Sequence, residues 1–271
     1  MTARSYLYVP AHRSEMIAKA ATRGADALIL DLEDSVPAAA KDEARYAAVR
    51  FLKDRPSGPE VWVRVNAGPL LEHDVRAIAA AGPDGVSLPK VSSADDVARL
   101  DVLLGDSNLA VAPLIETAAG VLDARAIALA PRVARLAIGE ADLCAELSIV
   151  PSKDQRELAP LRAQIVLASA AARIEPPIGS VSTDFSDLDG FRRSTEALRR
   201  QGFGGRAAIH PAQLAIVNEV FRPTPEALAA ARDLLERFDA AGGGATVDAE
   251  GHMIDEAVAR AARRLLSLAG D

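Results

Sequence analysis

Short apolar runs and amphipathic stretches alternate along most of the chain. The apolar runs predict eight strands, at 5–9, 27–31, 61–65, 85–89, 109–115, 133–138, 178–183 and 206–210. Ala-rich amphipathic stretches between them predict helices, for example at 14–24, 74–82, 95–105, 154–175, 187–202 and 212–221. Eight β-then-α units are the number found in a (β/α)₈ barrel, whose strands are buried on both faces and read as continuous apolar runs. The pattern therefore predicts an α/β protein with a TIM-barrel fold.

The end of the chain departs from this pattern. A helix is predicted from the proline-containing segment 222–225 to about Phe238, and the Gly-rich segment 240–252 then predicts a hinge or a hairpin-like loop. A final amphipathic helix is predicted at 255–270. We therefore expect a barrel domain at 1–222 and a C-terminal helical extension at 223–271, which covers the barrel or reaches across an active-site mouth.

Composition and charge exclude several classes of function. The chain has 271 residues, 49% of them hydrophobic, which is enough for a full barrel core. No apolar stretch approaches the length of a membrane span, and the N-terminus lacks the features of a signal peptide. A net charge of −7 argues against general nucleic-acid binding. The one cysteine, Cys144, fits a reducing compartment, so a cytoplasmic enzyme is expected.

Acidic residues follow three of the predicted strands. They are Asp31, Glu33 and Asp34 after the second strand, Glu116 after the fifth, and Glu140 and Asp142 after the sixth. Because the carboxyl ends of barrel strands form one rim, we expect these side chains to converge. Carboxylates are the ligands that Mg²⁺ prefers in proteins. The sequence therefore predicts a metal-dependent enzyme.

Seven motifs occur in a particular order along the chain. They are RSYLYVPA, DLEDSV with Lys41 and Arg45 following, RVN, LPK, LIET with Gly120, GEADL and AIHPAQ. In this order they resemble the citrate lyase β-subunit-like proteins of the HpcH/HpaI aldolase and citrate lyase superfamily, from about Arg4 to the final helix. The resemblance implies a Mg²⁺-dependent (β/α)₈ barrel that makes or breaks C–C bonds in CoA thioesters such as malyl-CoA or citramalyl-CoA. It also implies a homo-oligomer, commonly a trimer or a hexamer.

The resemblance implies a metal site and a substrate-binding cation. Glu116 and Asp142 match the family's two metal ligands. A carboxylate that stabilises the dipole of the following helix is the alternative for Glu116. Glu140 is either a ligand, an outer-shell group or a solvated loop acid. Arg64 ends a predicted strand, and its fork of donors suits a substrate carboxylate, carbonyl or enolate oxygen. A salt bridge from Arg64 to a rim acid is the alternative.

A further set matches the family's outer shell and its CoA site. Glu33 and Asp34 would hold metal-bound waters and neighbouring cations, or cap the next helix. Lys41 and Arg45 are four residues apart, so they share a helix face and would pair with those acids or with phosphate. The residues matched to CoA binding are Arg13, Lys19, His210 and Gln213. A structural hydrogen-bonding role is the alternative for His210, and Phe203-Gly204-Gly205-Arg206 replaces the Phe-Asp-Gly-Lys often found in the family.

The tail supplies a candidate general base. Asp255 matches the position where CoA lyases and malate-synthase-like members carry a catalytic aspartate, on a tail that covers a neighbouring subunit's barrel. Such an aspartate would take the substrate's hydroxyl proton. An ordinary helix N-cap is the alternative for Asp255, and Ala257 stands where the family commonly has proline.

Three other functions remain open. The first is a Schiff-base 2-oxo-acid aldolase, in which Lys90 at the end of the fourth predicted strand would form the Schiff base. The favoured interpretation of Lys90 is a charge partner of the acidic rim. A non-catalytic homologue that binds CoA or keto acids is the second. The third is a carrier-dependent citrate lyase β subunit, which acts on citryl groups held by an acyl-carrier protein. The presence of Asp255 in the tail favours a stand-alone lyase.

Overall fold

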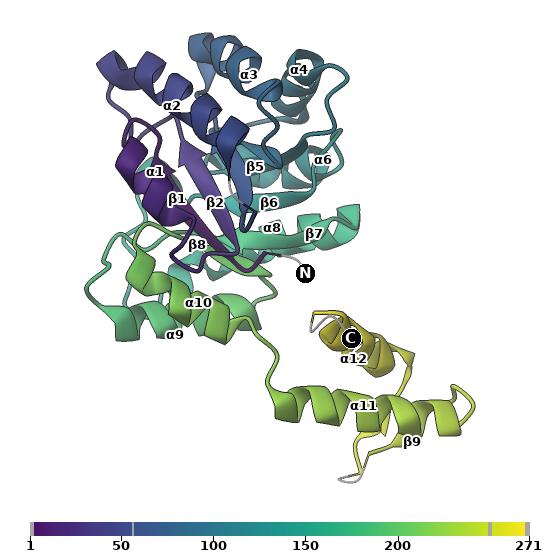
Figure 1. The fold of residues 1–271 in the computed structure, drawn as a ribbon. Coiled ribbons are helices and arrows are strands. Elements are labelled where there is room, and N and C mark those ends of the chain that lie inside the picture. The colour runs from purple at the N-terminus through teal and green to yellow at the C-terminus, as the bar shows by residue number, and fades with distance from the viewer. Residues whose placement is uncertain (1–2, 56, 249–250, 269–271) are drawn as a thin grey trace. The chain divides into compact units, whose positions relative to one another are not determined.

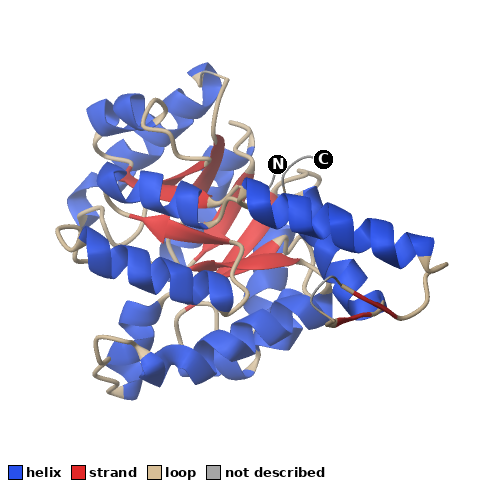
Figure 2. Cartoon of the chain, turned by 90° about the horizontal axis from the view of Figure 1, so that it is seen from below, coloured by secondary structure: helices blue, strands red, loops and turns tan. Residues whose placement is uncertain are grey.

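Eight parallel strands close into a barrel that helices surround, which confirms the predicted fold (Figures 1 and 2). This computed structural model describes residues 3–55, 57–248 and 251–268. The strands, each hydrogen-bonded to its neighbours in chain order, are β1 (Ser5–Pro10), β2 (Ala27–Asp31), β3 (Glu60–Arg64), β4 (Gly85–Leu88), β5 (Ala110–Ile115), β6 (Arg135–Ile138), β7 (Glu175–Gly179) and β8 (Gly205–Ala208).

The chain divides into two compact units between Asn218 and Glu219. The helices assigned to the barrel side of the chain are α1 (Ser14–Ala20), α2 (Lys41–Asp54), α3 (Leu71–Ala79), α4 (Ala94–Leu104), α5 (Ala118–Leu122), α6 (Ala124–Ala128), α7 (Glu140–Leu147), α8 (Ala159–Ala172), α9 (Leu188–Arg200) and α10 (Leu214–Val220), the last of which crosses the division. Within the described residues, no helix is long and apolar enough to cross a membrane.

Strand alternation decides which side chains enter the barrel. Ile29 packs in the interior cluster, and Asp31, two residues later, also lines the barrel cavity, whereas Leu28 and Leu30 are buried outside that cluster. The same period of two places Arg64 above Trp62 on β3. Inward positions therefore change from apolar to charged towards the carboxyl end of a strand.

The seventh strand lies earlier than predicted, because β7 spans Glu175–Gly179 rather than 178–183. Pro176 and Pro177 have no N–H to donate to a strand partner, which argues against a strand at this position. The register between β6 and β7 shifts between Arg135 and Ala137, so the pairing here is irregular. As a result, residues 180–183 form a loop at the barrel mouth instead of the end of a strand.

Some helix boundaries also differ from the predicted ones. The helix predicted at 154–175 begins only at Ala159, after a short 3-10 turn, because Gln155 adopts a left-handed backbone with φ of 54°. α3 begins at Leu71, three residues before the predicted start at 74. After β5 the chain forms two short helices, α5 and α6, with Thr117 as the N-cap of α5.

The second unit is a small helical hairpin with its own core. Its elements are α11 (Pro225–Ala240), β9 (Thr246–Val247), β10 (Met253–Ile254) and α12 (Glu256–Ser267). The Gly-rich segment forms an antiparallel hairpin of β9 and β10, one of the two forms predicted for it. Phe238, Ile254 and Ala259 form the buried cluster of this unit.

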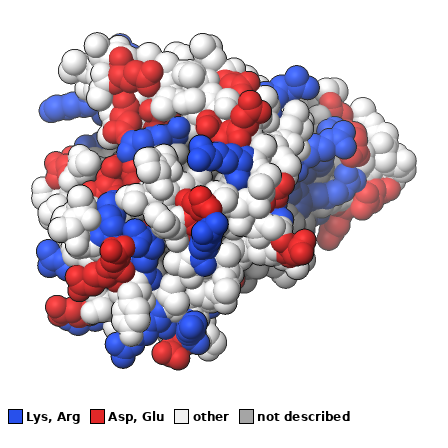
Figure 3. All heavy atoms as spheres, turned by 90° about the horizontal axis from the view of Figure 1, so that it is seen from above, with Lys and Arg blue, Asp and Glu red and all other residues white. Residues whose placement is uncertain are grey.

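Surface charge is mixed in sign. On the face drawn in Figure 3, Lys and Arg side chains lie among Asp and Glu side chains, and no continuous basic area appears on that face. Together with the net charge of −7, this mixed charge gives the drawn face no basic surface on which the phosphate backbone of a nucleic acid would bind.

A buried carboxylate joins the loops that follow β2 and β3. Asp74 on α3 is fully buried, and it accepts hydrogen bonds from the Asn66 main-chain N–H (2.7 Å), the Asn66 Nδ2 (2.6 Å) and the Arg45 Nε (2.7 Å). Lys41 Nζ donates to the Leu32 carbonyl (2.7 Å) and to Asn66 Oδ1 (2.7 Å). This network holds the barrel rim at β2 and β3 in place.

Removing the Asp74 carboxylate should destabilise the barrel. Asp74→Ala leaves the Arg45 guanidinium and the Asn66 donors without their buried partner, and we expect a loss of about 3 kcal/mol in the free energy of unfolding. Urea denaturation followed by circular dichroism measures this. Asp106→Ala, at an exposed aspartate after α4, is the control and should change stability by less than about 0.5 kcal/mol. Equal stability of the two variants would contradict the proposed role of the network.

Candidate active site

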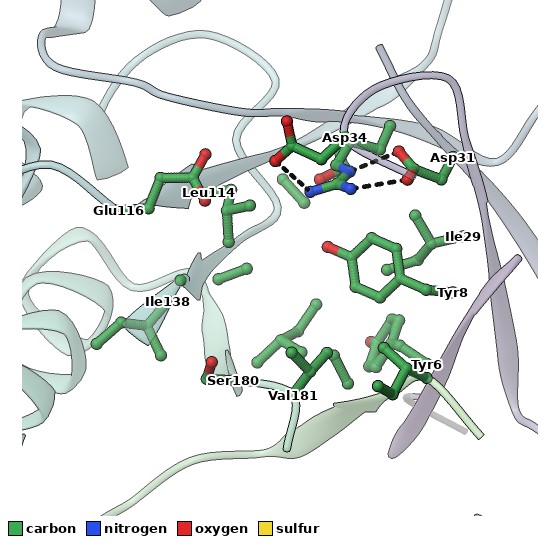
Figure 4. A pocket seen from close by; sticks show the side chains of 18 of the residues that line it. Tyr6, Tyr8, Ile29, Asp31, Asp34, Leu114, Glu116, Ile138, Ser180 and Val181 are labelled. Carbon is green, nitrogen blue, oxygen red and sulfur yellow. Dashed lines mark hydrogen bonds and ion pairs between the residues drawn. The ribbon is translucent and has the colours of Figure 1, made fainter. Parts of the chain in front are cut away.

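A cavity of about 220 Å³ opens at the carboxyl end of the barrel strands. The charged residues that line it are Asp31, Asp34, Arg64, Glu116 and Asp142. In Figure 4, Glu116 and the ion pair at Asp31 lie on one side of the cavity, and the Tyr8 side chain points into it. Acidic residues after the second, fifth and sixth strands thus converge at one cavity, as the strand pattern predicts, although Glu33 and Glu140 are not among its lining residues.

Arg64 is held by the acids of the β2 loop. Its Nε and NH2 atoms bind the two carboxylate oxygens of Asp31 at 2.6 and 2.7 Å, and its NH1 lies 3.1 Å from Glu33 Oε2. Burial by itself raises the pKa of Asp31, but the hydrogen bonds and charge of Arg64 outweigh it and lower that pKa. The guanidinium also lies 4.9 Å from the centre of the Tyr8 ring. The rim salt bridge named as an alternative for Arg64 is therefore present, and Arg64 faces the cavity at the same time.

Lys90 connects two groups of acids. Its Nζ contacts Glu33 Oε1 and lies 3.2 Å from Asp34 Oδ1, while its main-chain N–H donates to Glu116 Oε1 at 2.8 Å. The backbone is left-handed at this residue, with φ of 56°, and that turn directs the N–H and the side chain to different carboxylates. Burial lowers the pKa of Lys90, but the hydrogen bond and charge of Glu33 outweigh it and raise the pKa. A Schiff-base lysine needs a neutral amine, so this environment favours the charge-partner interpretation.

Glu116 is the carboxylate that burial perturbs most at this site. It is 4% exposed, and burial, with the charges of Asp142 and Glu33 adding to it, raises its pKa to about 7 against the hydrogen bond from Lys90. Asp142 lies exposed in the first turn of α7 and lines the same cavity. A raised pKa marks a negative charge that a bound cation would stabilise, and two carboxylates with open space beside them suit Mg²⁺ completed by water and substrate oxygens. Among the described residues no cluster of three or more acidic, histidine or cysteine ligands occurs.

Gly139 makes room for Glu116. A Cβ atom at residue 139 would lie 2.7 Å from the Glu116 Cβ and 2.5 Å from its Oε2. The backbone at Gly139 has φ of −106°, which other residues adopt easily, so close approach rather than backbone conformation requires the glycine. The glycine of the GEADL motif therefore determines where the Glu116 carboxylate lies.

Glu140 has a structural partner. Its two carboxylate oxygens bind Arg162 Nε at 2.5 Å and Arg162 NH2 at 2.9 Å, and Arg162 is 1% exposed. The Glu140 main-chain N–H donates to Ser180 Oγ at 3.2 Å. Glu140 does not line the cavity, so the ion pair places it behind the site. No pattern in the sequence pointed to Arg162, which lies in the first turn of α8.

Lys41 and Arg45 have partners other than the expected ones. Lys41 Nζ donates to the main-chain carbonyl of Glu33 at 2.8 Å, not to its carboxylate. Arg45 pairs with Asp42 and Asp74 instead of Glu33 or Asp34. Both cations therefore support the rim from below, and only the fold reveals the acid at residue 74 that holds Arg45.

None of the four residues matched to CoA binding lines the cavity. The Nδ1 of His210 accepts from the Ala212 N–H at 3.2 Å, and its ring stacks on Phe185 with centroids 5.1 Å apart. Gln213 is fully buried, and its amide binds the main chain of residues 182, 209 and 210. Arg13 and Lys19 are exposed on and before α1. The structural role named as the alternative for His210 is therefore present, and CoA contact stays a prediction for all four.

Arg206 replaces the family's lysine and is almost completely buried. It donates to the Ser180 carbonyl at 2.9 Å and to Thr195 Oγ1 at 2.7 Å, and burial lowers its pKa to about 10. It thus ties the loop after β7 to α9.

Asp255 caps α12 in the second unit. Its Oδ1 accepts from the Val258 N–H at 3.0 Å, which is the N-cap geometry named as the alternative to catalysis. A cap uses one carboxylate oxygen, so the geometry does not prevent a second role.

Comparisons with known proteins match nearly the whole chain. Residues 4–211 match the family model described as HpcH/HpaI aldolase/citrate lyase. The chain is 32% identical to the citrate lyase subunit beta of Leuconostoc mesenteroides subsp. cremoris, over 98% of this chain and 93% of that protein. It is 36% identical to a (3S)-malyl-CoA thioesterase of Cereibacter sphaeroides, over 88% and 84% of the two chains. The CitE protein of Mycobacterium tuberculosis, solved with magnesium, acetoacetate and coenzyme A, superposes with a TM-score of 0.83 at 34% identity over 99% and 98% of the chains.

A methyl group at residue 139 should weaken metal binding. Gly139→Ala forces the Glu116 carboxylate away from its place, and we expect the affinity for Mg²⁺ to fall by about tenfold or more. Isothermal titration calorimetry with Mg²⁺ measures the change. Gly244→Ala, where the new Cβ meets only one carbonyl oxygen at 3.4 Å, is the matched control and should bind Mg²⁺ as the parent does. An unaltered affinity in Gly139→Ala would remove Glu116 from the metal site.

Metal affinity should also depend on pH near neutrality. With a pKa of about 7, Glu116 is mostly protonated at pH 6 and mostly ionised at pH 8, and only the ionised form binds a cation. The dissociation constant for Mg²⁺ should therefore be about tenfold higher at pH 6 than at pH 8. Glu116→Gln, which cannot titrate, should lose this slope whatever its absolute affinity. A constant affinity for the parent protein across this range would show that Glu116 does not bind the ion.

Proposed function

Because the chain belongs to the HpcH/HpaI aldolase/citrate lyase family, we propose that it is a Mg²⁺-dependent lyase of β-hydroxyacyl-CoA thioesters. It would cleave malyl-CoA, citramalyl-CoA or a citryl-type thioester into an acyl-CoA and an oxo acid. The observation that carries the proposal is the buried Glu116 carboxylate, which shares a cavity with Asp142 and Arg64. The related CitE protein, bound to magnesium, acetoacetate and coenzyme A, supports the same ligands for this chain.

The chemistry assigns a task to each part of the site. Glu116 and Asp142 would hold Mg²⁺, which when bound supplies a Lewis acid for the substrate's hydroxyl and carboxylate oxygens. A base takes the hydroxyl proton, the oxygen's electrons form the new carbonyl, and the C–C bond breaks with its electron pair on the thioester fragment. That enolate then takes up a proton and leaves as acyl-CoA. Arg64, which Asp31 orients, lines the cavity, where its positive charge would stabilise the negative charge that develops on the substrate during cleavage.

The base is proposed to be Asp255, supplied by the tail of another subunit as a lid over the barrel. Exposed apolar side chains on neighbouring elements support an oligomer, a trimer or a hexamer: Leu122 on α5, Leu147 on α7 and Val150 just after it. Oligomers bury such patches at their interfaces. CoA would be held by Arg13, Lys19, His210 and Gln213. The free thiol of Cys144 fits a cytoplasmic location.

One relative favours a second candidate reaction on the same class of substrate. The Cereibacter sphaeroides protein is named a malyl-CoA thioesterase, so hydrolysis of the thioester bond is the second candidate. A carrier-bound citryl substrate is the third, since the Leuconostoc relative is a citrate lyase subunit. Products separate the three: acyl-CoA with an oxo acid, free CoA with a hydroxy acid, or no reaction with free CoA thioesters.

The first prediction concerns cleavage itself. We expect the protein to convert malyl-CoA or citramalyl-CoA into acetyl-CoA and glyoxylate or pyruvate with Mg²⁺, and to stop when EDTA is added. Glu116→Gln should lower the rate by about 10²-fold or more, since the developing charge loses its stabilisation. Liquid chromatography of the CoA species measures both. Glu72→Gln, at an exposed position on α3, should keep the parent rate. Cleavage that persists in EDTA would overturn the proposal.

The second prediction concerns the tail. Asp255→Asn keeps the N-cap, because asparagine caps as well as aspartate, but it removes the base, so activity should fall while the melting temperature stays the same. Mixing Asp255→Asn with Glu116→Gln and letting subunits exchange should restore part of the activity, because a sound tail then covers a sound barrel. Without recovery on exchange, the tail does not act between subunits.

A further inference from the structure

The active-site cavity continues below the charged rim into the barrel interior. We call this lower part the apolar well, and it is lined by Ile29, Trp62, Ala112, Ala137, Ile178 and Ala207. Ala112 lies on β5, four residues before Glu116, which directly follows that strand. Four residues of extended chain correspond to about 13 Å. The well therefore reaches far beneath the carboxylates, and its floor is formed by Tyr6 and Trp62.

Small side chains are the reason that the well is open. Barrel interiors are normally filled by layers of bulky branched residues, whereas β5, β6 and β8 contribute Ala112, Ala137 and Ala207 here. The Trp62 ring is accommodated by a glycine, because a Cβ at Gly85 would lie 2.3 Å from it. Three methyl groups thus face a space that three leucine-sized side chains would otherwise fill.

The walls of the well suit an apolar group. All five charged side chains that line the cavity lie at or beyond the carboxyl ends of their strands, above the well. At the floor the Trp62 Nε1 donates to Glu60 Oε2 at 2.9 Å, and the Tyr6 hydroxyl donates to the Ala3 carbonyl at 3.1 Å. These two polar atoms are already paired with the protein. The hydroxyls of Ser87 and Tyr8 also line the cavity, and the rest of the surface left for a ligand is mainly hydrocarbon.

Resting on the proposed function, we propose that the well binds an unbranched alkyl substituent on the hydroxyl-bearing carbon of the substrate. The polar head of the substrate lies at the rim with Glu116, Asp142 and Arg64, and the alkyl group extends downward past Leu114 into the well. The cavity of about 220 Å³ exceeds the roughly 150 Å³ that encloses a six-carbon ring, so it holds the head and an alkyl group of about three carbons. The oxo-acid product would accordingly be a 2-oxo acid of about five carbons.

This assignment predicts selectivity by polarity as well as by length. Each methylene that enters an apolar site should strengthen binding by about fourfold until the well is full. A second carboxylate at the end of the chain should be rejected, because no cationic side chain lines the well and the burial of an unpaired charge is costly. The well therefore favours 2-oxopentanoate over 2-oxoglutarate, which has the same number of carbons.

Trp62 is the only tryptophan of the chain, so its fluorescence reports directly on the well. The protein with Mg²⁺ is titrated with glyoxylate, pyruvate, 2-oxobutyrate, 2-oxopentanoate and 2-oxoglutarate. We expect the dissociation constant to fall stepwise from glyoxylate to 2-oxopentanoate, and 2-oxoglutarate to bind at least about tenfold more weakly than 2-oxopentanoate. Equal affinity for all chain lengths, or preference for 2-oxoglutarate, overturns the proposal.

Two variants change the volume of the well in opposite directions. Ala207→Leu fills the well. The measured quantity is the rate of condensation of acetyl-CoA with 2-oxopentanoate divided by the rate with glyoxylate, and this ratio should fall by about tenfold or more. Ile178→Ala enlarges the well and should raise the rate of condensation with 2-oxohexanoate relative to the rate with glyoxylate. Ala170→Leu, an identical substitution at an exposed position of α8, should leave both ratios at the parent value.

The outcomes distinguish the two proposals. Turnover with glyoxylate or pyruvate but not with longer acids, or ratios that neither variant changes, overturns the apolar well and leaves the lyase function standing. Absence of binding and of turnover with every oxo acid overturns both. If Ala207→Leu does not fold, Ile178→Ala and the chain-length series still decide the question.

Discussion

Closure of eight parallel strands is the constraint on which the rest of this structure depends. A closed parallel barrel directs alternate side chains of each strand inward and brings all the carboxyl ends to one rim. Asp31, Arg64 and Glu116 come from strands far apart in the sequence, yet they line one cavity because Asp31 and Arg64 end β2 and β3 and Glu116 directly follows β5. These three residues therefore need no special loop to meet.

Charge compensation divides the rim into two parts. Asp31 and Glu33 are neutralised by Arg64 and Lys90, and Glu140 is neutralised by Arg162 behind the site. Within the described part of the chain, Glu116 receives only a main-chain hydrogen bond from Lys90, and its pKa rises to about 7, mainly as a result of burial. A protein that places one buried carboxylate beside another without neutralising it loses stability there, and function is the usual reason.

The same interior that presents the charges also leaves space beneath them. Alanines on β5, β6 and β8 form part of the interior cluster and at the same time line the cavity, so the barrel core and the substrate site share residues. Burial of more apolar surface at these positions would stabilise the fold and close the well. The metal chemistry and the proposed side-chain selectivity are thus stacked along one barrel axis, with polar groups above and hydrocarbon below.

The sequence by itself determined the barrel, the strand ends that carry the acids, and the family, because hydrophobic period and motif order are local properties of the chain. The sequence placed β7 wrongly, because Pro176 and Pro177 argue against a strand at the position where an irregularly paired strand in fact lies. Only the tertiary structure decided which acids are neutralised: Arg162 and Asp74 are far in sequence from the partners that they hold. The open space under the rim was likewise invisible, because a cavity depends on what eight strands fail to fill together.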